Sequence, residues 1–133
     1  MRKLASLFFL LNSPFASAKA PADEYFKVET VAVSFIDAME MAVTPEGQVF
    51  VTERTGAVKL VDPENGKVNV IATIPVEVRK KEFARECGLL GIALDPNYEK
   101  NKWVYLYYSV QGKPVHHLAR FTFEGGQLGS EKT

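Results

Sequence analysis

The sequence predicts an all-β fold made of about two four-stranded blades of a β-propeller. Residues 38–123 break into short strand-like runs that are separated by turn signals. The pattern around Pro45 recurs at Pro96, 51 positions later, and propeller blades of four strands repeat at roughly this period, about 40–50 residues. The strands of the second repeat are apolar on both faces, so a further layer is expected to cover each face.

The first residues have the features of a secretory signal peptide. Arg2 and Lys3 are basic, residues 4–11 are apolar, and residues 16–18 read Ala-Ser-Ala, a small-residue cleavage pattern. The apolar run is shorter than the roughly 18 residues that a membrane span requires. We therefore expect a signal peptide over residues 1–18, cleaved after residue 18 or 20, and a periplasmic or secreted protein without a membrane span.

Charge and cysteine content exclude several classes of function. The 16 basic and 16 acidic side chains balance, so there is no basic excess of the kind that nucleic-acid binding requires. Cys87 is the single cysteine, which excludes a disulfide framework and a cysteine-based zinc site.

The first repeat is predicted to contain four antiparallel strands, at residues 39–43, 48–53, 57–61 and 67–74. Pro45 and Gly47 fit a type I turn after the first strand, and the Asp-Pro-Glu-Asn-Gly run at residues 62–66 fits a turn before the fourth. Glu53 and Arg54, where the second strand ends, are candidates for ion pairs near the rim. Before this repeat, residues 26–35 alternate in the manner of a further strand.

Residues 76–85 interrupt the strand pattern with the basic run Arg79-Lys80-Lys81. One interpretation is a solvated connecting loop, and the other is a loop that lines a site for an anionic group. The second repeat then contributes strands at residues 88–94, 102–109 and 115–123, with no recognisable fourth strand. Two blades cannot close a propeller, so we expect a piece truncated within its second blade.

Several stretches resemble the soluble quinoprotein glucose/sorbosone dehydrogenases. They are VFVTERTGAV at residues 49–58, DPENG at 62–66, GLLGIALDPNY at 88–98 and VYLYY at 104–108. The resemblance covers residues 38–123 and makes residues 26–133 the N-terminal part of such a propeller. It implies a six-bladed propeller that binds pyrroloquinoline quinone (PQQ) on a calcium ion and oxidises an aldose or related sugar aldehyde at C1. In such enzymes a His acts as general base while hydride moves to the quinone, and an electron acceptor completes turnover.

The resemblance places one pocket residue within this chain. In the family a polar side chain, often Gln, stands two residues before the GLLG stretch and reaches the sugar and quinone pocket; here this residue is Glu86. The family's catalytic His, calcium ligands and PQQ clamp follow beyond Thr133, so no catalytic or metal-binding residue is expected in this chain, which should be inactive alone. The other interpretation of Glu86 is a loop carboxylate paired with Arg85 or Arg54.

Two other groups of polar residues have structural explanations. His116 and His117 are adjacent on a predicted strand, so they point to opposite faces and cannot easily bind one metal. Asp95, Asn97, Glu99 and Asn101 are spaced like calcium ligands, but Lys100 stands where a calcium loop needs Gly, which favours a turn. An alternative to the enzyme is a non-catalytic extracellular propeller that binds a partner, since fold does not fix function.

Overall fold

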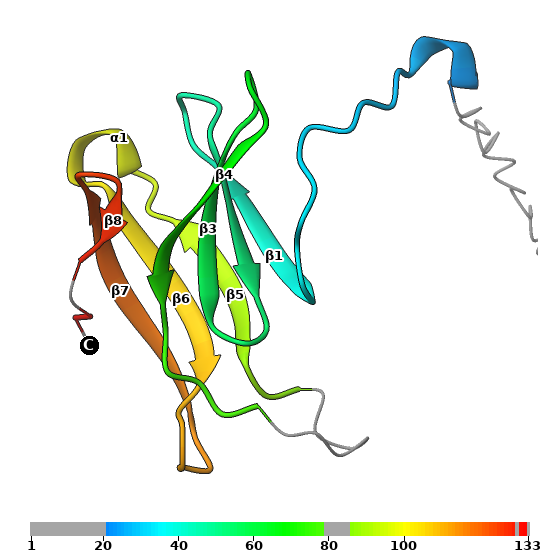
Figure 1. Cartoon of the computed structure of the whole chain (residues 1–133). Coiled ribbons are helices and arrows are strands. Elements are labelled where there is room, and N and C mark those ends of the chain that lie inside the picture. Colours follow the sequence, from blue (N-terminus) through cyan, green and yellow to red (C-terminus); the bar gives the residue numbers. More distant parts are fainter. Residues whose placement is uncertain (1–20, 79–85, 130, 133) are drawn as a thin grey trace, which may run out of the picture.

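The computed structural model describes residues 21–78, 86–129, 131 and 132. It contains two four-stranded antiparallel sheets, and in each sheet the strands lie in the order of the sequence (Figure 1). This arrangement confirms the prediction of an all-β fold built from two four-stranded blades. The expected signal peptide and the basic run at residues 79–81 lie outside the described residues.

Sheet 1 is formed by the first repeat. Its strands are β1 (Ala38–Val43), β2 (Val49–Glu53), β3 (Ala57–Asp62) and β4 (Lys67–Thr73). The predicted turns connect them: the Thr44 carbonyl accepts a hydrogen bond from Gly47 N–H at 2.9 Å, and Asp62 side-chain oxygens accept from Glu64 N–H and from Asn65. Gly47 and Gly66 have positive φ angles of 86° and 68°, which these tight turns require.

Sheet 2 is formed by the second repeat and contains a strand that the sequence did not predict. Its elements are β5 (Leu89–Leu94), α1 (Tyr98–Asn101), β6 (Trp103–Ser109), β7 (His116–Glu124) and β8 (Gln127–Leu128). The expectation of only three strands is therefore wrong. Gly125 and Gly126 form a tight turn, and β8 pairs with β7 through Phe123–Leu128 and Glu124–Gln127. Two residues are too short a run to give a recognisable alternation.

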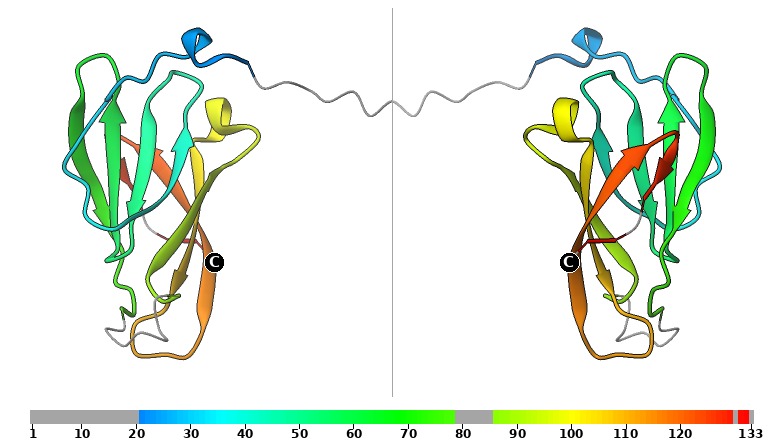
Figure 2. Two further views of the ribbon diagram at one scale, coloured as in Figure 1. Left: turned by 90° about the vertical axis from the view of Figure 1, so that its right-hand side faces the viewer. Right: turned by 90° about the vertical axis from the view of Figure 1, so that its left-hand side faces the viewer.

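The predicted strand at residues 26–35 does not form. The chain has a short 3-10 helix at Asp23–Tyr25, and residues 26–35 then cross the outer face of sheet 1 without pairing (Figure 2). Their alternating apolar side chains stay exposed, including Val28 at 97%. An alternating pattern becomes a strand only where a neighbouring strand supplies hydrogen bonds, and no described strand pairs with this segment.

The core lies between the two sheets, which pack face to face (Figure 2). Phe50 from sheet 1 meets Tyr98 edge-on at 6.2 Å and Phe123 at 5.2 Å between ring centroids. The fully buried side chains come from both sheets: Phe50, Thr52, Val58, Ile71, Leu89, Val104 and Leu106. One face of each sheet is thus covered, while the outer faces expose apolar side chains such as Met41 and Tyr107.

Strands β1 and β5 lie beside each other across the two sheets, and both run in the same direction (Figure 1). One end of the sheets, where β5 begins, therefore gathers Asp37, the β2–β3 turn and the β6–β7 turn around Glu86; we call it the Glu86 end. The opposite end carries the turns at Thr44 and Asp95. No helix among the described residues has the length and apolar content that a membrane crossing needs.

Candidate functional site

Glu86 lies in a turn directly before β5 and is exposed. Among the described residues it has no hydrogen-bond or ion-pair partner. Its carboxylate is thus available at the Glu86 end. The alternative pairing with Arg54 does not occur, because that guanidinium binds Asp37 instead, and Arg85 lies outside the described residues.

The turn that carries Glu86 rests directly on sheet 1. The Arg54 carbonyl accepts a hydrogen bond from Leu89 N–H at 3.0 Å, so the backbones of the two sheets are joined here. Gly88 has a φ of 139°, and a Cβ at this position would lie closer than 3.0 Å to the Arg54 carbonyl and to its Cγ atom. Only glycine fits this close approach, which explains its place at the start of the GLLG stretch.

Arg54 is held by the segment that enters β1. Its Nε donates to Asp37 Oδ2 at 2.5 Å, and its backbone N–H donates to the Asp37 carbonyl at 3.0 Å. The Nη1 atom is buried and has no partner. A buried guanidinium nitrogen without an acceptor is costly, so Arg54 is the least satisfied polar group in the described part of this end.

Glu53 forms a buried ion pair beneath Arg54. The residue is 4% exposed, and its Oε1 accepts from Lys59 Nζ and from Ile36 N–H, each at 2.6 Å. Burial acts to raise the pKa of Glu53, but the Lys59 hydrogen bond and the Ile36 N–H outweigh it and hold that pKa below its usual value. The expected rim ion pairs of Glu53 and Arg54 are therefore present, with Lys59 and Asp37 as partners.

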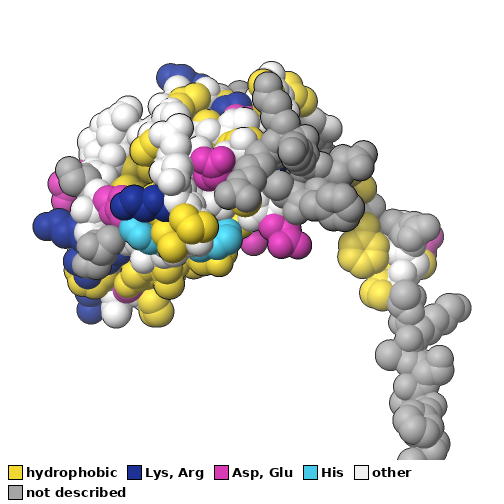
Figure 3. Space-filling view, turned by 90° about the horizontal axis from the view of Figure 1, so that it is seen from below, with side chains coloured by type: hydrophobic (Ala, Val, Ile, Leu, Met, Phe, Trp, Pro, Cys, Tyr) yellow, Lys and Arg dark blue, Asp and Glu magenta, His cyan; other side chains and the backbone are white. Residues whose placement is uncertain are grey.

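The two histidines do not form a metal site with each other. Figure 3, which looks onto the Glu86 end, shows histidine side chains beside hydrophobic ones. His116 stacks on Tyr107 at 5.3 Å, while His117 lies 3.7 Å from Glu131 and meets Tyr108 edge-on. Within the described residues no three His, Cys, Asp or Glu side chains are grouped to hold a metal ion.

The Asp95 loop at the opposite end is a structural turn. Asp95 Oδ1 accepts from Asn97 N–H at 2.8 Å and Asn101 at 2.9 Å, and its Oδ2 accepts from the Tyr105 hydroxyl at 2.7 Å. These hydrogen bonds, that of Asn101 foremost, lower the pKa of Asp95. Its oxygens are thus occupied by protein donors, which agrees with the expectation of a structural turn.

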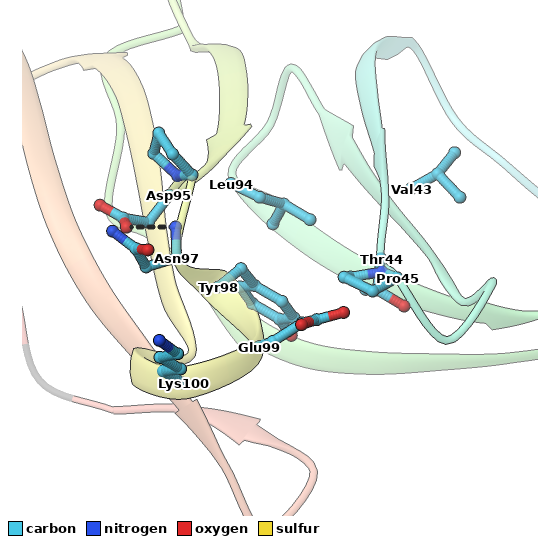
Figure 4. Close-up of a pocket in the computed structure, with 10 residues that line it drawn as sticks. Val43, Thr44, Pro45, Leu94, Asp95, Asn97, Tyr98, Glu99 and Lys100 are labelled. Atoms are coloured by element: carbon cyan, nitrogen blue, oxygen red, sulfur yellow. Dashed lines mark hydrogen bonds between the residues drawn. The ribbon is translucent and has the colours of Figure 1, made fainter.

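A hollow of about 530 Å³ lies beside this loop, between the Thr44 and Asp95 turns (Figure 4). The Asp95 carboxylate turns toward Asn97 and away from the space, and of the labelled carboxylates Glu99 alone points across it, toward Thr44 and Pro45. The hollow also lies at the far end of β5 from Glu86. The Glu86 end therefore remains the better candidate for function.

Comparison with known proteins identifies the family. The family model described as glucose/sorbosone dehydrogenase matches residues 35–132. The chain belongs to the glucose/sorbosone dehydrogenase family. An Acinetobacter calcoaceticus protein named quinoprotein glucose dehydrogenase B is 31% identical over 98 residues, which cover 73% of this chain and 20% of that protein.

Two further proteins are similar to this member of the glucose/sorbosone dehydrogenase family. An uncharacterized Synechocystis protein is 35% identical over 111 residues, covering 75% of this chain and 27% of that protein. A solved PQQ-bound aldose sugar dehydrogenase from Streptomyces coelicolor has a TM-score of 0.67 at 27% identity, over 79% of this chain and 31% of that one. The chain thus spans less than a third of the relatives that it matches.

The sequence pointed to Glu86 but not to the residues that support it. Asp37 and Lys59 lie in unremarkable polar positions, and their pairing with Arg54 and Glu53 depends on how residues 34–37 enter sheet 1. The role of Ser109 was also not predicted. A polar residue at the end of an otherwise apolar strand was a usable signal, because a buried polar side chain needs a hydrogen-bond partner.

Proposed function

We propose that this chain is the N-terminal part of an exported PQQ-dependent dehydrogenase that oxidises an aldose or related sugar aldehyde at C1. The observation that carries this proposal is the likeness to the PQQ-bound aldose sugar dehydrogenase, which covers 79% of the chain. The remaining blades of the propeller, a sugar and an electron acceptor are the partners that this function requires.

Glu86 is proposed to contact the sugar. Its exposed carboxylate stands at the end where the β2–β3, β4–β5 and β6–β7 connections of both blades meet. An ionised carboxylate accepts hydrogen bonds and donates none, so it would accept the hydrogen bonds that sugar hydroxyl groups donate. Glu86 therefore differs from a Gln at this position, which offers both a donor and an acceptor.

The described residues do not themselves form a site for PQQ or calcium. PQQ is an anion and needs cationic partners, but two of the described cations at this end, Arg54 and Lys59, are already engaged by Asp37 and Glu53. No described group of side chains has the ligands that a calcium ion prefers. We therefore place the PQQ clamp and the calcium ligands in the later blades of the complete protein.

Enzyme assays on two proteins test this function. The 133-residue chain, mixed with PQQ, calcium, glucose and an artificial electron acceptor, is expected to give no turnover above a control without protein. A complete protein that contains this chain is expected to oxidise aldoses only when PQQ is added. Aldose binding without turnover in the complete protein would instead support the non-catalytic extracellular binding module, which the carboxylate at position 86 also allows.

Export is proposed from the first 18 residues. Expression of the chain with its own N-terminus should yield a product in the periplasm or medium whose sequence begins at residue 19 or 21. A product that stays in the cytoplasm with Met1 intact would contradict export without affecting the proposed chemistry.

A further inference from the structure

Ser109 connects both ends of the segment that leads to Glu86. Its carbonyl accepts from Glu77 N–H at 3.0 Å, before that segment. Its side-chain Oγ accepts from Gly88 N–H at 3.2 Å, after Glu86, and its own N–H donates to the Gly88 carbonyl at 2.9 Å. A single residue at the end of β6 therefore fixes where the chain leaves sheet 1 and where it enters β5.

These hydrogen bonds lie out of water. Ser109 is 3% exposed, and the Oγ hydrogen bond to Gly88 is buried. Loss of a buried acceptor leaves the donor unsatisfied, which costs more than the loss of a solvent-exposed hydrogen bond. On its other side, Gly88 is pressed against the Arg54 carbonyl, which already accepts the hydrogen bond from Leu89 N–H.

We infer that Ser109 is a positioning residue, which holds the Gly88 turn so that the Glu86 carboxylate stays at the sugar site. This inference rests on the proposed function, from which we take it that the site at Glu86 binds a sugar. Ser109 itself contacts neither sugar nor cofactor; it acts through Gly88, two residues from Glu86. The hydroxyl is the part that matters, because the backbone groups of Ser109 are common to every residue.

The chain offers a matched control for the loss of this hydroxyl. Thr44 is 4% exposed, and its Oγ1 also accepts a backbone N–H, from Gln48 at 3.1 Å. It lies at the opposite end of the sheets. Ser109→Ala and Thr44→Val thus each remove one buried hydroxyl acceptor, but only Ser109→Ala acts at the Glu86 end.

Cys87 provides a local probe in the chain as it stands. It is the single thiol, it is half-buried, and it lies between Glu86 and Gly88. Loosening of the turn should expose it, so Ser109→Ala is expected to speed its reaction with an aromatic disulfide reagent about tenfold. Thr44→Val should react at the wild-type rate. An unchanged rate in Ser109→Ala, or an equal rise in both variants, would overturn the inference.

Kinetics of the complete protein supply the second measurement. With PQQ and calcium bound, Ser109→Ala should raise KM for the aldose about tenfold with little change in kcat, and it should add nothing to Glu86→Ala. A KM that rises for Glu86→Ala but not for Ser109→Ala contradicts the positioning role. If even the unaltered protein oxidises no aldose, the proposed function fails, and the Cys87 rate alone decides the role of Ser109.

Discussion

Glu53 shows how single residues anchor the approach to the Glu86 end. Its carboxylate is buried, yet it stays ionised because Lys59 and the Ile36 N–H both donate to the same oxygen. Lys59 also donates to the Ser34 carbonyl at 3.0 Å. One buried ion pair therefore connects β2 and β3 with the segment that precedes β1.

This pair makes stability depend on pH in a defined direction. A carboxyl whose pKa is lower in the folded than in the unfolded state stabilises the fold above its unfolded pKa, and the benefit is lost as pH falls through the folded value. The difference in unfolding free energy between the wild type and Glu53→Gln should therefore have its full size at neutral pH. It should shrink as the pH falls below 4.5, the ordinary pKa of a glutamate carboxyl. Urea unfolding between pH 3 and 7 measures it, and a constant difference would contradict it.

Gly88 should be intolerant of a side chain. Gly88→Ala adds a Cβ within 3.0 Å of Arg54 at a φ of 139°, so we expect a loss of about 3 kcal/mol or more in unfolding free energy. Gly112→Ala is the matched control, since Gly112 also has a positive φ, of 71°, but nothing lies within 4 Å; it should cost about 1 kcal/mol. Equal losses in denaturant unfolding would show that the close approach to Arg54 has no role.

At the scale of elements, the sequence predicts the longer strands well, and each of these pairs with a neighbour along the chain. The seven main strands begin and end within one residue of their predicted limits, because each is bounded by a turn whose residues fix its backbone angles. The segment at 26–35 has an equally good alternation, but it has no neighbouring hairpin to pair with. The prediction of a strand at residues 26–35 failed because alternating apolar and polar residues indicate one buried face, but they do not indicate that a partner strand is present.

The β5–β6 connection gives a prediction at this scale. Asp95 accepts three hydrogen bonds, from Asn97, Asn101 and Tyr105. Asp95→Ala should therefore lower the unfolding free energy more than Glu99→Ala, which alters an exposed residue of the same connection and should change it by less than about 0.5 kcal/mol. Thermal or urea unfolding would distinguish them, and similar values would contradict the structural role of Asp95.

At the scale of the whole molecule, the outer face of sheet 1 remains apolar and open. Met41 is 64% exposed and Val43 57% exposed, and a groove of about 470 Å³ runs between this face and residues 29–32. A contiguous apolar surface of this kind favours association. Two blades cannot close a propeller, so this face of sheet 1 has no neighbouring blade to cover it.

We expect the isolated chain to associate through this face as its concentration rises. Met41→Lys should weaken that association at least about tenfold, because a charge would have to be buried. Gln111→Lys, which adds the same charge to an exposed turn, should leave it unchanged. Light scattering over a concentration series gives the comparison; a monomeric wild-type chain, or equal effects of both variants, would contradict the prediction.

Every strand pair in both sheets joins neighbours in the sequence, and this has a consequence for biosynthesis. Sheet 1 needs only residues 38–73 to complete its hydrogen bonds, so it can form on the ribosome before β5 has been translated. The Leu89–Arg54 hydrogen bond can form only afterwards, when β5 reaches a sheet that is already assembled. We therefore expect the first blade to serve as the template on which the second is assembled, and the Glu86 turn to become fixed only after β5 and the end of β6 have been translated.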